Sequence, residues 1–136
     1  MVKIKLNSEV MRYITLLETL TGATIKDCLI EDNKLIFVVN EGEAGIAIGK
    51  DGKNVRKVSE ITGKEVEVME FSPDPKIFVR NIFKPLKVGN VQLHEQGGKK
   101  IMRIETVKNH PLTGSKLRRA KLMLQKYFEI DDVLIS

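Results

Sequence analysis

Several residue types are scarce in this chain of 136 residues, which has one cysteine, no tryptophan, two tyrosines and five phenylalanines. A single cysteine cannot form an internal disulfide, so we expect a reducing, cytoplasmic environment and a buried, inert Cys28. No apolar run approaches the roughly 20 residues that cross a bilayer, and the start lacks the apolar core of a signal peptide, so no membrane association is expected. The few aromatic residues argue against a base-stacking platform like that of RRM or OB domains.

The charge is distributed unevenly along the chain. Residues 1–72 carry 10 Lys and Arg against 12 Asp and Glu, a net charge of −2, whereas residues 73–136 carry 13 against 6, a net charge of +7. The two values sum to the overall +5. A basic half of this size favours a polyanionic partner, although a solvated basic surface is the commoner reason for any one run of charge.

The first half alternates helical and strand patterns. Asn7 or Ser8 is expected to cap a first helix, which Gly22 ends. The following segments predict a hairpin, a short helix, a glycine loop, a longer helix and a half-buried strand, at residues 23–40, 41–48, 49–52, 53–62 and 64–71. In the longer helix we expect Val55, Val58 and Ile61 to face inward.

The same order of elements then recurs in the second half. Asp74 and Pro75 are typical of a helix start, and two strands around Gly97–Gly98 predict a hairpin. A helix over 115–128 and a closing strand over 131–135 complete the pattern. We therefore predict an α+β fold with two tandem domains, 1–72 and 73–136, each a small three-stranded sheet packed against helices.

The stretch "AIGKDGKNVRKV" in the first half contains a glycine loop, for which three phosphate-binding motifs are candidates. A nucleotide-binding P-loop needs four residues between its glycines and a hydroxyl residue after the lysine. Here only three residues separate Gly45 from Gly49, and Asp51 stands in place of the hydroxyl residue. A dinucleotide fingerprint needs a glycine at Ala47 directly after a strand. The third motif, a Gly-x-x-Gly loop between two helices that clamps single-stranded nucleic acid, matches Gly49 and Gly52.

The residue types around this loop suit contact with a nucleic-acid backbone. Glycines allow a sugar-phosphate chain to approach without an intervening Cβ, and the helix start after the loop attracts phosphate. Lys50 and Lys53 add positive charge, and Asn54 offers hydrogen-bond donors. Ile48 and Val55 form an apolar surface for bases. A plain helix–helix turn with surface lysines is the alternative reading of the loop alone.

With its surroundings, "AIGKDGKNVRKVSEITGKEVEV" resembles the signature region of the prokaryotic-type (type II) KH domain. Two such domains in tandem resemble the short archaeal NusA-like proteins, which implies an RNA-binding factor in transcription termination or antitermination. Longer NusA proteins add a polymerase-binding domain and an OB-type domain, and neither pattern is present here, so contact with RNA polymerase stays open. The resemblance implies this set of RNA-binding residues: Ile48, Gly49, Lys50, Asp51, Gly52, Lys53, Asn54, Val55 and Arg56.

The second copy departs from the KH pattern. "LTGS", residues 112–115, stands where "GKDG" stands in the first copy, so both loop glycines are lost. Pro111 would also interrupt any helix before this segment. We therefore do not expect this copy to clamp a backbone. The basic residues of its last helix are either secondary phosphate contacts or a solvated surface: Lys116, Arg118, Arg119 and Lys121.

No sign of catalysis or of a bound cofactor emerges from the sequence. His94 and His110 are far apart and lack neighbours suited to holding a metal, so neither a metal nor a cofactor is predicted. No serine, cysteine or lysine has a base and an orienting partner in its sequence context, which argues against an enzyme. We expect a monomer that binds single-stranded RNA. Two alternatives remain: a ribosome-assembly or RNA-processing factor with the same fold, and a structural protein that docks on polymerase.

Overall fold

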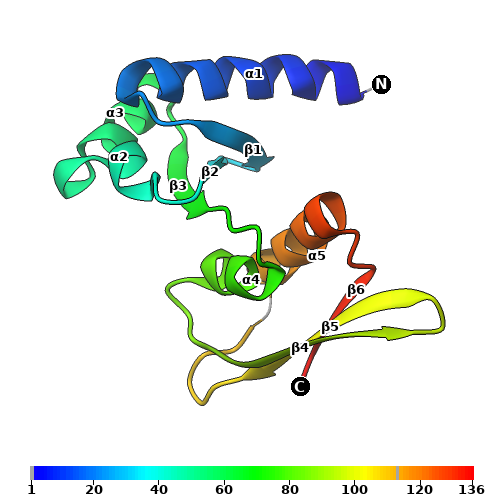
Figure 1. Cartoon of the computed structure of the whole chain (residues 1–136). Coiled ribbons are helices and arrows are strands. Elements are labelled where there is room, and N and C mark those ends of the chain that lie inside the picture. The colour runs from blue at the N-terminus through cyan, green and yellow to red at the C-terminus, as the bar shows by residue number, and fades with distance from the viewer. Residues whose placement is uncertain (1, 113) are drawn as a thin grey trace. The chain divides into compact units, whose positions relative to one another are not determined.

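The computed structural model describes residues 2–112 and 114–136, with side chains described from Ser8 onward. The chain divides into two compact units, Met1–Phe71 and Ser72–Ser136. In each unit the helices lie on one side of a three-stranded sheet (Figure 1). Among the described residues, no helix combines the length and the apolar character needed to span a bilayer.

The first unit contains four helical segments and three strands in the predicted order. They are α1 (Val2–Thr21), β1 (Ile25–Glu31), β2 (Lys34–Val39), α2 (Ala44–Ile48), the short 3-10 turn η1 (Lys50–Gly52), α3 (Lys53–Thr62) and β3 (Glu65–Glu70). The sheet order is β1-β2-β3, so β2 is central. It pairs antiparallel with β1 and parallel with β3. A parallel pair needs a long crossover connection, and here α2, η1 and α3 supply it.

A hydrophobic cluster joins the three helices of this unit to its sheet. Leu17 of α1, Ala47 of α2 and Val58 of α3 are fully buried in it, together with Phe37 and neighbouring residues of β2. Burial of this apolar surface is the main stabilising contribution to such a small unit. The cluster also anchors α2 and α3, which are the two helices that flank the glycine loop.

Two expectations about these helices are wrong. The first helix begins at Val2 and runs through Asn7 and Ser8, so neither residue caps it. Ile61 is 57% exposed and does not face the core. Residues three apart on a helix are displaced by about 60° around its axis at each step, so a face that is centred on Val58 does not extend to Ile61.

Cys28 lies in β1 and is buried, as the sequence predicts. Burial, with a smaller contribution from the Asp27 carboxylate, raises the pKa of the Cys28 thiol to about 12. The thiolate is the reactive form, and it is scarce when the pKa lies so far above the pH of the solution.

We therefore expect Cys28 of the folded protein to resist a disulfide reagent such as dithionitrobenzoate at about pH 8, where an unshifted thiol reacts readily. Absorbance would follow the reaction, and urea-unfolded protein provides the control because it should react quickly. Similar rates in the folded and unfolded protein would contradict the buried position of this thiol.

The second unit repeats the sheet topology of the first. Its elements are α4 (Pro75–Phe83), β4 (Val88–Gln96), β5 (Lys99–Thr106), α5 (Gly114–Phe128) and β6 (Asp132–Ile135). β4 and β5 are antiparallel, and β5 and β6 are parallel. Asp74 caps α4 by accepting a hydrogen bond from the Lys76 amide at 2.9 Å, with Pro75 at the first helical position, as predicted. Buried Phe78 and Leu124 bring the two helices onto the sheet.

The connection before the last helix differs between the units. In the first unit α2 and η1 precede α3, whereas in the second the described residues between β5 and α5 form a tight turn closed by a bridge between Val107 and His110. Pro111 follows this turn directly, and it cannot continue a helix. The described part of the second unit thus has no counterpart of α2, as the sequence predicts.

Candidate nucleic-acid interface

The backbone between α2 and α3 makes a loop in which three of the four residues 49–52 have positive φ. Gly49 ends α2 with φ 80°, Asp51 has φ 55°, and Gly52 begins α3 with φ 75°. Glycine adopts such angles without penalty, and Asp tolerates the left-handed region better than most residues do. The Gly52 amide donates to the Gly49 carbonyl at 3.1 Å and closes the turn. The spacing of the two glycines is therefore required by the shape of the loop.

Gly49 is required for a second reason, which is close packing. A Cβ added at Gly49 would lie 2.7 Å from Asn54 Nδ2 and 2.9 Å from the Asn54 backbone nitrogen. Asn54 is held there because its Nδ2 donates to the Ile46 carbonyl at 3.0 Å. This bond ties the start of α3 to α2 and fixes the angle between the two helices on either side of the loop.

Arg56 supports the other side of the loop. Its Nη1 donates to the carbonyl of Asp51, one turn before it. Asn54 and Arg56, both predicted to contact RNA, thus each make a hydrogen bond that holds the loop backbone. Further contact of either side chain with RNA stays a prediction.

The remaining predicted residues of the loop are displayed at the surface. Lys50, Asp51 and Lys53 are exposed, and Val55 is half-buried. Ile48 is 37% exposed, and Ile46, which no sequence motif marks, is 53% exposed. The short stretch "AGIAI" indicates this exposure, because only its Ala47 is buried in the core and its isoleucines can face solvent. Apolar and basic side chains therefore lie next to each other at this loop.

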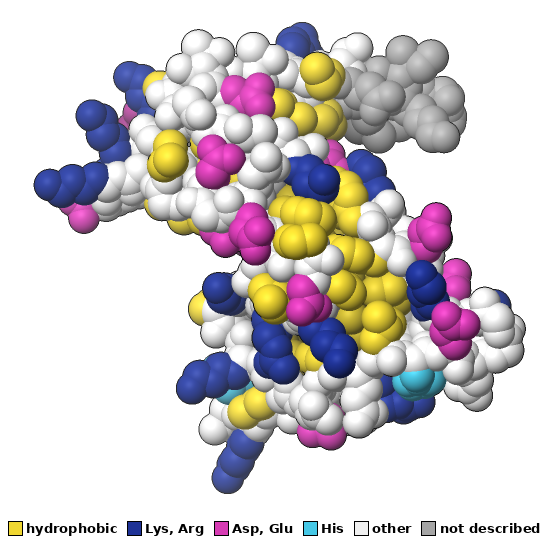
Figure 2. Space-filling model, in the orientation of Figure 1, with side chains coloured by type: hydrophobic (Ala, Val, Ile, Leu, Met, Phe, Trp, Pro, Cys, Tyr) yellow, Lys and Arg dark blue, Asp and Glu magenta, His cyan; other side chains and the backbone are white. Residues whose placement is uncertain are grey.

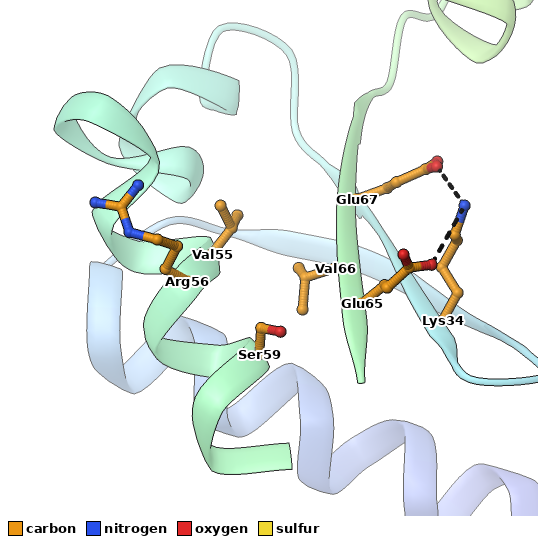
Figure 3. A pocket seen from close by; sticks show the side chains of 7 residues that line it. All are labelled: Lys34, Val55, Arg56, Ser59, Glu65, Val66 and Glu67. Atoms are coloured by element: carbon orange, nitrogen blue, oxygen red, sulfur yellow. Dashed lines mark hydrogen bonds and ion pairs between the residues drawn. The ribbon is translucent and has the colours of Figure 1, made fainter. Parts of the chain in front are cut away.

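A groove of about 340 Å³ lies between α3 and β3, beside the loop (Figure 3). Val55, Arg56 and Ser59 of α3 line one side. The other side is formed by β3, with Val66 directed toward the helix. Val55 and Val66 thus give the groove apolar surface on both sides, and the Arg56 guanidinium and the Ser59 hydroxyl belong to its helical side.

The open edge of the sheet adds backbone groups to this groove. β3 is an outer strand whose one described neighbour is β2. The amides of Glu65 and Phe71 donate toward β2, at 2.9 and 2.8 Å. Because the direction of backbone groups alternates along a strand, the peptide groups of Val66 and Val68 are directed to the opposite, open edge. The edge of a nucleobase carries hydrogen-bond donors and acceptors, so it can bind such backbone N–H and C=O groups at a fixed spacing.

The charge of the groove differs between its two sides. Glu65 and Glu67 extend from β3 on the face away from α3, where Lys34 bonds Glu67 at 2.9 Å and lies 4.0 Å from Glu65 (Figure 3). The two carboxylates and Lys34 therefore lie together on that face. The side formed by the loop and α3 carries exposed Lys53 and Arg56. A strand of nucleic acid would therefore be attracted at its phosphates by the loop side.

The four predicted secondary contacts in α5 are not equivalent. Arg119 is only 2% exposed, so its guanidinium is not available to a phosphate, which corrects that expectation. Arg119 precedes Met123 by four residues and therefore shares the buried face of the helix. Lys121 lies 3.9 Å from Asp132. Lys116 donates to the Lys84 carbonyl at 2.7 Å, and Arg118 is exposed.

Neither histidine belongs to a cluster of metal-binding side chains. In the described part of the chain, no three His, Cys, Asp or Glu residues gather in a way that could hold a metal ion. His110 uses its Nδ1 to accept a hydrogen bond from the Lys87 amide at 3.0 Å, which is a structural role.

Comparison with known proteins identifies the family. Residues 11–94 match the KH domain. The chain is 39% identical to the probable transcription termination protein NusA of Methanococcus vannielii, over 87% of its own length and 64% of that protein. It is 32% identical to the proteins of the same name from Methanocaldococcus jannaschii, over 99% of this chain and 76% of the relative, and from Halococcus morrhuae, over 98% and 99%.

A solved structure shows the same arrangement of elements. The crystal structure of APE1850 matches with a TM-score of 0.77 and 34% identity, over 94% of this chain and 98% of that one. The residues that match the KH domain, 11–94, include the Gly-x-x-Gly turn. The chain therefore belongs to the KH domain family, as a NusA-like member.

Proposed function

We propose that this NusA-like protein binds single-stranded RNA through the loop Gly49–Gly52 and acts in transcription termination or antitermination. The observation that carries the proposal is an exposed glycine loop that Asn54 and Arg56 hold in shape, beside a groove with an open strand edge. A loop that is already held in shape loses little conformational entropy on binding. The relatives named probable transcription termination proteins support the cellular role.

Under this proposal, RNA lies with its backbone along the loop and its bases toward β3. Lys50 and Lys53 attract phosphates, and the amides at the start of α3 receive them. Ile48 and Val55 contact the base faces. The positive charge lies on the loop side of the groove, at Lys53 and Arg56, which favours this orientation of the strand.

The open edge of β3 would then read the bases. The N–H and C=O groups of Val66 and Val68 are fixed in the sheet, so they form hydrogen bonds with base edges without reordering. Duplex RNA has its base edges paired and its deep groove closed to side chains, so it does not fit the same site. The proposal thus includes a preference for single strands.

We further propose that both units are KH domains, 1–72 with an active loop and 73–136 with a degenerate one. The shared pairing pattern, antiparallel then parallel with a helical crossover, supports this assignment. The absence of a counterpart of α2 among the described residues of the second unit supports the loss of the clamp there.

The cellular role is tested by recovering the tagged protein from a lysate of its source organism, with and without ribonuclease, and sequencing the RNA crosslinked to it. We expect nascent transcripts, together with RNA polymerase that is lost when ribonuclease is added. Polymerase that resists ribonuclease would instead indicate a protein that docks on polymerase. Ribosomal RNA precursors as the main crosslinked species would indicate a ribosome-assembly factor.

A further inference from the structure

One end of the second unit gathers basic side chains from three segments of the chain. Lys84 and Lys87 flank the connection from α4 to β4, Lys108 lies in the turn after β5, and Lys116 lies in the first turn of α5. Two bonds hold these segments together: the Lys116 ammonium donates to the Lys84 carbonyl, and the Lys87 amide donates to His110 Nδ1. We call these four lysines the basic end.

Acidic residues are absent from the sequence around the basic end. Residues 75–94 and 106–128 contain no Asp or Glu, and the six acidic residues of the second unit are all elsewhere: Asp74, Glu95, Glu105, Glu129, Asp131 and Asp132. Within the described residues, Lys84, Lys87 and Lys108 are exposed and have no carboxylate within ion-pair distance. Dark-blue side chains project from this end at the lower left of Figure 2.

The basic end offers charge but no means of reading bases. The clamp of the first unit depends on two glycines and on α2, and the described part of the second unit has neither at this position. Flexible lysines with water around them attract phosphates wherever these lie and do not distinguish one base from another.

We propose that the basic end binds the phosphodiester backbone of RNA without sequence preference, as an electrostatic anchor. This rests on the proposed RNA-binding function and assigns the second unit a separate part in it. The anchor differs from the predicted contacts in α5, since it excludes the buried Arg119 and adds Lys84, Lys87 and Lys108 from outside that helix.

The test is a salt series of RNA-binding titrations with two unrelated single strands. The variant carries Lys84→Gln, Lys87→Gln and Lys108→Gln, and its control carries Lys76→Gln, Lys99→Gln and Lys126→Gln, which remove the same charge elsewhere in the same unit. Each phosphate contact on a single strand contributes about 0.7 to the slope of log affinity against log salt, so we expect the slope to fall by about 2 in the variant. The control should change far less, and both strands should weaken equally.

Three results would overturn the anchor. An unchanged slope would make the basic end a solvated surface or a site for an acidic protein. An equal fall in variant and control would show that diffuse net charge is responsible. Unequal weakening of the two strands would indicate base reading. Circular dichroism and urea unfolding of both variants establish that each is folded.

Repeating the series with Lys50→Asp separates this inference from the proposed clamp. If Lys50→Asp binds RNA like the parent while the triple variant has a reduced slope, the anchor stands and the clamp is wrong. If Lys50→Asp loses binding and the triple variant does not change the slope, the clamp stands and the anchor is wrong. A parent protein without RNA affinity would overturn both.

Discussion

Lys50→Asp is expected to remove most single-stranded RNA binding and to leave the fold intact. The change places a second carboxylate beside Asp51 at the exposed tip of the loop, where the proposed clamp meets phosphate. Like charges at contact distance oppose binding strongly, so affinity should fall by about tenfold or more. Fluorescence anisotropy with a labelled single strand measures the loss, and circular dichroism follows the fold.

Lys64→Asp is the matched control for this variant. It makes the same change of charge beyond Gly63, at the other end of α3, which is a helix of 10 residues and therefore about 15 Å long. We expect only a small loss of affinity there. If both variants weaken RNA binding equally, net charge and not the loop accounts for the affinity, and the clamp is wrong.

Gly49→Ala is expected to damage both stability and RNA binding. Gly49 has φ 80° and ψ 164°, a backbone region that is essentially restricted to glycine, so an alanine there costs about 1–3 kcal/mol. The new methyl group would also meet Asn54 Nδ2 at 2.7 Å and its backbone nitrogen at 2.9 Å, and such overpacking typically costs a further 1–3 kcal/mol, roughly. Relief of the contact requires α3 to move away from α2, which would spoil the loop. Urea unfolding and the RNA titration measure the two effects.

Gly42→Ala provides the control for conformational strain alone. Gly42 has φ 82°, close to that of Gly49, but a Cβ there meets nothing within 4 Å. It should therefore cost about 1–2 kcal/mol and leave RNA affinity unchanged. Equal destabilisation by the two alanines would mean that packing against Asn54 contributes nothing.

Local signals made much of the first unit predictable. Glycines mark both the beginning and the end of α3, and Gly22 ends α1, since each must adopt positive φ. The structure has α3 at Lys53–Thr62, as the spacing of apolar residues between the two glycines predicts. The position of the loop between two helices followed from the same residues.

Features that depend on three-dimensional packing are harder to predict from the sequence. Ser8 has the side chain of a helix cap but lies inside α1, because helical spacing continues toward the start through Val10, Leu6 and Val2 in the sequence. Arg119 resembles its exposed neighbour Arg118 in sequence, and only its position four residues before Met123 indicates burial. The intrinsic preference of a residue type for a cap or for the surface predicts its place poorly wherever tertiary packing favours another outcome.

The groove beside the loop could not be predicted from the sequence at all. It depends on β3 being at the edge of the sheet, and the alternation in "KEVEVMEF" is compatible with either a central or an edge position. The pairing of Lys34 with Glu67 joins residues that are 33 positions apart. Strand order is a property of the whole unit. The open edge of β3, which is proposed to contact the bases, is therefore seen only in the structure.

The parallel pairing of β2 with β3 has a consequence for the order of events during synthesis. Lys34 lies opposite Glu65, and Val39 opposite Glu70, so the segment that carries the loop is enclosed between paired strands. On the ribosome the β1–β2 hairpin can form early because its turn is local, whereas the parallel pair must wait until Glu70 has left the exit tunnel. Until that moment the nascent chain contains both glycines of the loop, yet it has no groove in which to hold RNA.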